Sequence, residues 1–336
     1  MRLPLAYRIA SMRPVTPHPS TIPVPFDPDR LRERLRQEAQ WIARVPHFNF
    51  SNVAEFYAAH DRQTWDLDTD IPNCAPPFSS FWVEWNEPKR WNMGPGRTEQ
   101  GERNGQHGFF VLAYEVTDTN RADVDYWVAA LSRLIGYEGP GVADDGTRER
   151  IAAGLGDARW VLCCSRWLTS NAPDIQGAPV WLGLLTVLFV AADGHCGHWF
   201  GTGPTARFIS ETADRNSVWS PVHVLTLGLS FCHCKNVRRV EAEVDAGERF
   251  HRREKVPRIR FYTLEINPMR EVLRREGQAE RVGLVRALHI CRGHFATYTP
   301  EHPLFGKYVG TFWRPDHVRG SREAGEVNKN YSVGSP

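Results

Sequence analysis

Apolar side chains recur at helical spacing in several parts of the chain. After Asp27 and Pro28, a pair that favours the start of a helix, Leu31, Leu35 and Ile42 fall on one stripe. A similar period returns further along the chain, in stretches that mostly begin at a capping residue or end at glycine. We therefore predict helices over residues 27–45, 52–57, 122–135, 148–155 and 220–231.

Other stretches are continuously apolar or alternate between apolar and polar residues, which is typical of strands. The longest apolar run ends at Ala192, and the Asp193-Gly194 pair that follows has the composition of a hairpin turn. We predict strands over residues 81–85, 109–116, 160–167, 181–192, 259–266, 288–298 and 309–313. Because helices and strands are intermixed, the predicted fold class is α+β, with a mixed N-terminal domain and a basic, β-rich C-terminal module.

The segments between these elements are predicted from composition. We expect an exposed loop at 92–108, a charged linker at 247–256 and a short basic helix at 268–276. Residues 1–26 contain six prolines and lack a continuous apolar stretch, so we expect an extended leader and no signal peptide. The longest apolar run, 180–192, is too short for a membrane-spanning helix, which needs about 20 residues.

Composition refines this picture. The chain has 336 residues and 41% of them are hydrophobic, enough for a substantial core and for two domains. Its seven cysteines are an odd number in a chain of this length, which argues against a secreted disulfide framework. We therefore expect a cytoplasmic protein that does not bind membranes.

Charge is distributed unevenly along the chain, although the formal net charge is only +2. Residues 1–231 carry 21 basic and 26 acidic side chains, whereas residues 232–320 carry 18 and 11, a net of +7. Such a basic segment indicates a polyanionic partner, or else simply a solvated charged face. The predicted division is a leader at 1–26, a mixed domain at 27–231, a basic module at 232–320 and a tail at 321–336.

The basic module carries the side-chain types that bind and cleave phosphodiesters without a metal. Arginine and lysine stabilise phosphate charge, an aromatic ring stacks on a base, and histidine transfers a proton near neutral pH. In a single extended strand, Arg292 and His294 would share one face. We predict His294 and His317 as a catalytic acid–base pair. The predicted nucleic-acid contacts are Arg292, Tyr298, Lys307, Trp313 and Arg319.

Histidine and cysteine pairs offer a different chemistry. His195 and His198 form one pair and Cys232 and Cys234 another, and zinc is held by such ligands in sets of four. However, the chain has no Cys-x-x-Cys knuckle, and Cys232 ends an apolar helical run in which a free cysteine is commonly buried. We expect no cofactor and keep a structural zinc site as an alternative.

Several of these stretches together resemble a known family. They read LSFCHCKNV at 229–237, RFYTLEINPMREVLR at 260–274, and ALHICRGHF, PLFGKYVGTFW and HVRGS within 287–321. They are similar to a family of uncharacterised proteins from bacterial genomes, phages and mobile elements. The segment IPNCAPPFSSFWVEW at 71–85 also resembles the N-terminal part of that family. The resemblance implies a bacterial or viral setting in the cytoplasm and brings no known activity with it.

Three hypotheses about function follow. The leading one is a nucleic-acid-binding protein of a phage or mobile element, with RNA or DNA as partner and metal-independent ribonuclease activity as its more specific form. The second is a non-enzymatic interaction protein or assembly subunit with a protein partner. In that case Arg292, His294 and Trp313 determine the fold. The third is a protein with a structural zinc site.

Overall fold

The structure, a computed structural model, is described over part of the chain. The residues it describes are 3–11, 28–59, 71–87, 105–135, 145–169, 178–202, 215–244, 246–266, 287–291, 293–314, 317–319 and 321–326. The chain divides into two compact units. The sheet unit comprises residues 1–232 and 239–264, and the C-terminal unit comprises residues 233–238 and 265–336.

An eight-stranded mixed sheet is the centre of the sheet unit, with the strand order β6-β5-β4-β3-β2-β1-β8-β7. Neighbouring strands from β2 to β6 are antiparallel, whereas β1 is parallel to both β2 and β8. The strands are β1 His47–Asn49, β2 Ser80–Asn86, β3 Gln106–Glu115, β4 Ala158–Thr169, β5 Pro179–Ala191, β6 His198–Thr202, β7 Val237–Glu243 and β8 Arg260–Ile266. Together with the helices this sheet confirms the predicted α+β class.

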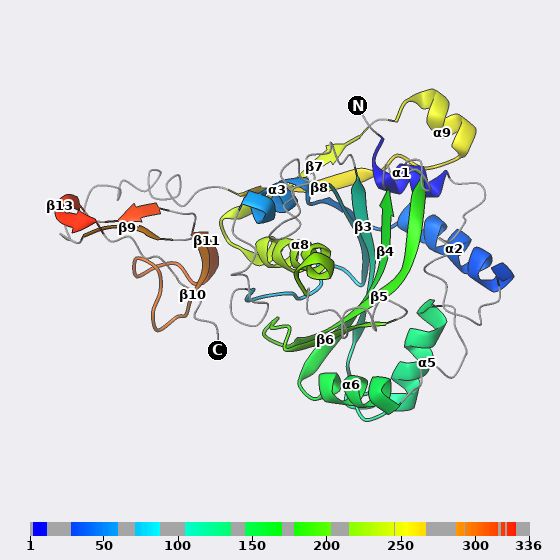
Figure 1. The fold of residues 1–336 in the computed structure, drawn as a ribbon, viewed down its shortest axis with the longest axis horizontal. Coiled ribbons are helices and arrows are strands. Elements are labelled where there is room, and N and C mark those ends of the chain that lie inside the picture. The colour runs from blue at the N-terminus through cyan, green and yellow to red at the C-terminus, as the bar shows by residue number, and fades with distance from the viewer. Residues whose placement is uncertain are drawn as a thin grey trace. The chain divides into compact units, whose positions relative to one another are not determined.

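Helices lie on both sides of the sheet, with α8 and α3 on one side of the strands and α2 and α5 on the other (Figure 1). The helices are α1 Leu5–Ala10, α2 Pro28–Ile42, α3 Ser51–Ala59, α5 Val124–Ile135, α6 Asp145–Leu155, α8 Arg215–His233 and α9 Glu248–Glu254. Helices α1 and α2 pack on Trp82, Phe110 and Trp167 in one core cluster, and α5 and α6 pack beside them in another. On the other side, α8 lies so close that a Cβ at Gly228 would meet the ring of Phe50.

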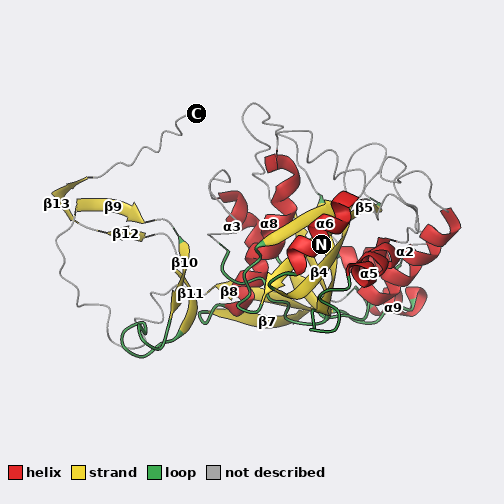
Figure 2. Cartoon of the chain, turned by 90° about the horizontal axis from the view of Figure 1, so that it is seen from below, coloured by secondary structure: helices red, strands yellow, loops and turns green. Residues whose placement is uncertain are grey.

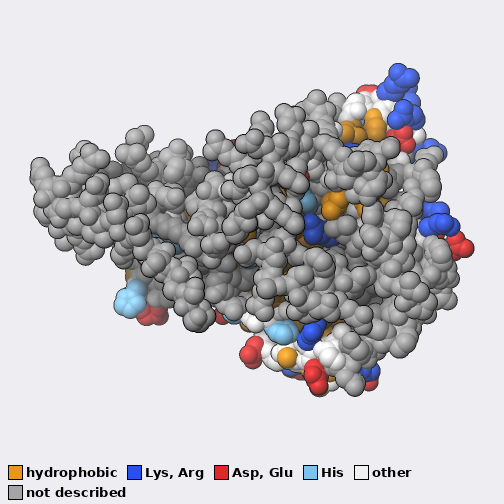
Figure 3. All heavy atoms as spheres, in the orientation of Figure 1, with side chains coloured by type: hydrophobic (Ala, Val, Ile, Leu, Met, Phe, Trp, Pro, Cys, Tyr) orange, Lys and Arg blue, Asp and Glu red, His pale blue; other side chains and the backbone are white. Residues whose placement is uncertain are grey.

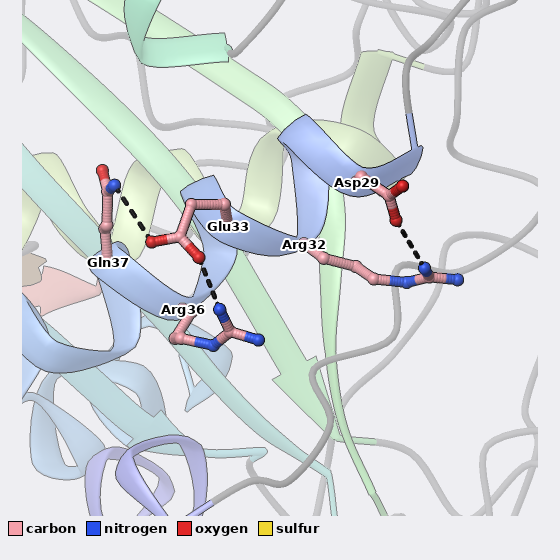
Figure 4. Close-up of polar contacts among 5 residues, drawn as sticks. All are labelled: Asp29, Arg32, Glu33, Arg36 and Gln37. Atoms are coloured by element: carbon pink, nitrogen blue, oxygen red, sulfur yellow. Dashed lines mark hydrogen bonds and ion pairs between the residues drawn. The ribbon is translucent and has the colours of Figure 1, made fainter.

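Helix α2 shows how one sequence serves two environments. Its outer face carries local polar contacts within the helix, from Arg32 to Asp29 and from Arg36 and Gln37 to Glu33 (Figure 4). Such pairs stabilise an exposed helix by only a few tenths of a kcal/mol, about 0.2–0.5 each. Its inner face is apolar except for Glu38, so the helix is held on the sheet mainly by burial of these apolar side chains.

Glu38 is a buried carboxylate whose hydrogen bonds are satisfied. The Ser165 hydroxyl and the Trp167 indole N–H donate to its Oε1 at 2.6 and 2.7 Å. Arg34 pairs with its Oε2 at 3.1 Å. A buried charge is tolerated when it is paired and hydrogen-bonded in this way, so Glu38 ties α2 to strand β4.

The expectation of an extended leader is wrong for residues 5–10, which form α1. Leu5, Ala6, Tyr7 and Ile9 have no exposed surface, and the helix has no side-chain cap of its own. Instead, the backbone N–H groups of Leu5 and Ala6 donate to the Glu84 carboxylate on β2, at 3.2 and 2.9 Å. The helix is thus stabilised by a distant strand, which a local pattern cannot reveal.

Other expected boundaries also differ. The expected linker at 247–256 contains helix α9, and the expected strand at 288–298 is two strands, β9 Ala287–Cys291 and β10 His294–Tyr298. Gln106–Gly108, placed in the loop at 92–108, begin β3, while residues 92–104 and the helix at 268–276 lie outside the described residues. Part of the expected tail forms β13 Ser321–Glu326, which pairs with β9.

The division into units also differs from the expected boundary after residue 231. Strands β7 and β8 pair in the large sheet, so residues 239–264 belong to the sheet unit. Among the helices the structure describes, none is long and apolar enough to cross a bilayer.

Candidate nucleic-acid interface

The C-terminal unit contains a short antiparallel hairpin, which Figure 2 shows as two adjacent strands. Strand β10 pairs with β11 Gly310–Arg314, with His294 opposite Arg314 and Tyr298 opposite Gly310. Residues directly opposite each other in an antiparallel pair lie on the same face, and alternate residues of a strand share a face. His294, Tyr298, Phe312 and Arg314 therefore lie on one face of the hairpin.

On this face a cation lies over an aromatic ring. The Arg314 guanidinium carbon is 5.3 Å from the centroid of the Tyr298 ring, and the Tyr298 ring in turn meets Phe312 edge to face at 5.9 Å. His294, at the open end of the same face, is exposed. Sequence reasoning missed Arg314, because only the strand register places it beside Tyr298.

The loop between the two strands adds a second pair of this kind. Leu304 bridges to Tyr308, and both pack with Tyr298 and Phe312 in a small core cluster. The Lys307 ammonium lies 5.2 Å from the Tyr308 ring centroid. We call this region, formed by His294, Tyr298, Arg314 and the loop 303–309, the hairpin–loop surface.

Trp313 lies on the opposite face of the hairpin and has a structural role there. Only 2% of its surface is exposed, and its ring packs edge to face on Phe295 at 4.9 Å. Its backbone is held by the Asn236 side chain, which accepts from the Trp313 N–H at 2.9 Å and donates to its carbonyl at 2.8 Å. A base cannot stack on a ring buried in this way, so Trp313 is not part of the hairpin–loop surface.

Charge separates more clearly once the two units are known. The C-terminal unit carries 13 basic and 8 acidic side chains, a net of +5, and the sheet unit has a net of −3. The segment 239–264 belongs to the sheet unit, and three of its arginines are each paired with a glutamate: Arg253, Arg258 and Arg260. Figure 3 shows basic and acidic side chains together over α9, at the upper right. The excess positive charge therefore belongs to the unit that holds the hairpin.

The remaining predicted residues lie in or beside a second small sheet of the C-terminal unit, in the order β12-β9-β13. Strand β12 His317–Arg319 runs antiparallel to β9, with His317 opposite Cys291 and Arg319 opposite His289. The side chains of β12 and the whole of Arg292 lie outside the described residues. His294 belongs to the other sheet, where its cross-strand partner is Arg314, so the predicted pair His294–His317 comes from two different sheets.

The cysteine and histidine pairs are placed as follows. His195 precedes β6 and His198 begins it, with the His198 ring 5.5 Å from Phe189. Cys232 lies in the last turn of α8 and Cys234 follows that helix. Burial raises the pKa of the Cys232 thiol to about 12. Among the residues that the structure describes, no three His, Cys, Asp or Glu side chains are grouped so as to hold a metal ion.

A polar cluster that sequence reasoning did not single out lies within the large sheet. Arg166 Nη2 on β4 is 3.4 Å from His107 Nδ1 on β3, and the His107 ring stacks on Trp85 of β2 at 5.6 Å. Burial lowers the pKa of His107 to about 3, with a smaller contribution from Arg166, so the imidazole is neutral. Burial also lowers the pKa of Arg166 to about 10, against the opposing attraction of Glu87. The cluster thus holds a guanidinium in an environment that disfavours its charge.

Comparison with known proteins gives no relative from which a role could be transferred. The chain matches no protein family, no curated protein and no solved structure.

Proposed function

We propose that this protein binds nucleic acid through the hairpin–loop surface of its C-terminal unit. The observation that carries the proposal is the Arg314 guanidinium over the Tyr298 ring, on the same face as His294. A cation next to an aromatic ring suits a nucleic-acid strand, because the cation can contact a phosphate while the ring contacts a neighbouring base. The net charge of +5 on this unit supports the proposal, since phosphate contacts dominate such affinities.

The roles within the surface follow from its chemistry. Arg314 and Lys307 contact phosphate, and Tyr298, already covered on one side by Arg314, supplies an aromatic edge beside them. Arg292 and Arg319 remain proposed phosphate contacts in the same basic unit. The setting in a phage or mobile element, inferred from the motif at 287–321, is part of this proposal and agrees with a nucleic-acid partner.

Binding is tested with a fluorescently labelled 30-nucleotide RNA of mixed sequence and the full chain. We expect the logarithm of the affinity to fall linearly with the logarithm of salt concentration. Arg314→Ala should reduce the affinity about tenfold and lower the salt slope by about one. Arg32→Ala is the matched control, because Arg32 is exposed on the sheet unit and paired with Asp29. Binding that does not depend on salt, or equal losses in both variants, contradicts the proposal.

Ribonuclease activity is the more specific proposal and has its own test. His294 would be the base or acid, with His317 as its counterpart. Cleavage of the same RNA is followed on gels in the presence of EDTA. The proposal requires that His294→Ala abolish cleavage while leaving binding within about threefold, since a general acid or base acts on the rate rather than on affinity. If wild-type protein leaves the RNA intact, the ribonuclease proposal is wrong, and the binding proposal is decided by the salt dependence alone.

A further inference from the structure

The loop of the hairpin–loop surface holds an aromatic residue in an unfavourable backbone conformation. Phe305 has φ 54°, and Gly306 after it has φ 71°. The Lys307 N–H donates to the Leu304 carbonyl at 3.1 Å, which closes a four-residue turn. Two successive positive φ angles are the mark of a type I′ turn, whose first central position is normally glycine, asparagine or aspartate. A phenylalanine there is strained.

The rest of the loop imposes this conformation. The Leu304 N–H donates to the Tyr308 carbonyl at 2.8 Å, and the Tyr308 N–H donates back to Leu304 at 3.0 Å. Leu304 is buried against Phe312, and the Gly306 N–H donates to the Pro303 carbonyl at 3.2 Å. A strained residue persists when its surroundings determine its conformation in this way, and such residues gather at functional sites.

Packing within the protein does not explain why this position holds an aromatic side chain. Phe305 is 49% exposed, and the neighbouring Val309 is 43% exposed. At this position asparagine would relieve both the backbone strain and the exposure of an apolar ring to water. The phenylalanine therefore costs stability twice, and nothing within the C-terminal unit compensates for it among the described contacts.

An exposed aromatic ring in a loop that also carries a lysine matches the chemistry of a nucleic-acid strand. Nucleobases present flat apolar faces that stack on aromatic rings, and the phosphate next to a stacked base meets a nearby ammonium. In a duplex those faces are already covered by neighbouring base pairs, whereas in a single strand they are open. Lys307 lies two residues after Phe305 in the same turn, so the loop that holds the exposed ring also carries a positive charge.

We propose that Phe305 is a base-stacking residue, which makes the hairpin–loop surface select single-stranded over double-stranded nucleic acid. This inference rests on the proposed function, because it assigns the strand type to the same surface. It requires that the exposed ring, rather than positive charge alone, carries the preference for unpaired bases.

The test compares full-length variants on a labelled 20-nucleotide single strand and on its duplex, at one salt concentration. Phe305→Asn should bind the single strand about tenfold more weakly while its affinity for the duplex stays within about twofold. Phe305→Tyr, which keeps an aromatic ring, should retain the affinity for the single strand. Tyr126→Asn is the matched control, because Tyr126 is 46% exposed on helix α5 of the sheet unit, outside the proposed surface, and its loss should change neither affinity.

A second measurement separates loss of the ring from loss of the fold. Relief of strain predicts that Phe305→Asn slows amide hydrogen exchange in the peptide containing Gly306, Lys307 and Tyr308 about fivefold. Weaker binding together with a more stable loop is the expected result. Equal binding of wild type and Phe305→Asn to the single strand overturns this inference alone. A wild-type protein that binds neither probe overturns the proposed function as well.

Discussion

Glu84 gives the protein a pH dependence that can be worked out from the structure. Its carboxylate on β2 is buried and accepts hydrogen bonds from the Leu5 and Ala6 backbone and from the Trp82 indole. Burial raises the pKa of Glu84 from 4.5 to about 6. The three hydrogen bonds and the Arg8 guanidinium lower this pKa but do not offset the burial.

The sign and size of the effect follow from linkage. A pKa that is higher in the folded state means that the folded protein holds the proton more tightly than the unfolded chain does. The stability that Glu84 contributes is therefore complete below pH 4.5 and is lost as the pH rises through about 6. A difference of about 1.5 pKa units corresponds to about 2 kcal/mol of unfolding free energy.

The assay is urea denaturation of wild type and Glu84→Gln at intervals from pH 4.5 to pH 7.5. Other titrating groups are common to both proteins, so the difference between the two unfolding free energies isolates Glu84. We expect the advantage of wild type over the variant to fall by about 2 kcal/mol across this range. Glu115→Gln, an exposed glutamate 3.5 Å from Arg159, is the control and should show a change below about 0.5 kcal/mol. A constant difference for Glu84→Gln would refute the reasoning.

Three further predictions concern the sheet unit. Burial lowers the pKa of His47 to about 4, so the stability that His47 contributes is present above pH 6.5 and is lost as the pH falls through about 4. When the unfolding free energy is measured as a function of pH, His47→Asn should therefore lose about 3 kcal/mol less than wild type on acidification. Gly228→Ala should cost about 1–3 kcal/mol in urea denaturation, because its Cβ would lie 2.1 Å from the Phe50 ring. Gly156→Ala, whose nearest neighbour is 3.6 Å away, should cost far less. Arg166→Met should raise the thermal midpoint, because it removes a guanidinium whose charge burial disfavours; a fall in the midpoint would contradict this.

Much of the fold could be predicted because its signals are local. Helices α2 and α5 follow the period of their apolar residues, and β4 and β5 follow long apolar runs. Helix α1 could not be predicted, since it has six residues and its first N–H groups depend on Glu84, some 80 positions away. Strand β1 has only three residues and is defined by its parallel neighbours β2 and β8.

The candidate site was predictable in its residue types but not in its geometry. His294, Tyr298 and Lys307 were selected by their chemistry, and they lie on the hairpin or its loop. Trp313 was selected on the same grounds, yet its place in the strand register turns it to the packed face. Arg314, one residue further on, faces Tyr298 for the same reason. A shift of one residue along a strand exchanges the two faces, and composition does not contain that information.

Phe305 shows most directly why a surface must be interpreted from backbone geometry. The sequence around it, Leu304 to Lys307, reads as an ordinary turn because glycine follows the aromatic residue. Only its φ angle shows that phenylalanine occupies a position suited to glycine or asparagine, and only its exposure shows that the ring is not there to pack. The strained backbone at Phe305 lies within the C-terminal unit, which also carries the excess positive charge. Backbone strain and excess positive charge both destabilise the isolated protein. The single-stranded nucleic acid that we propose as ligand would compensate for both, through base stacking on the ring and phosphate contacts to the cations.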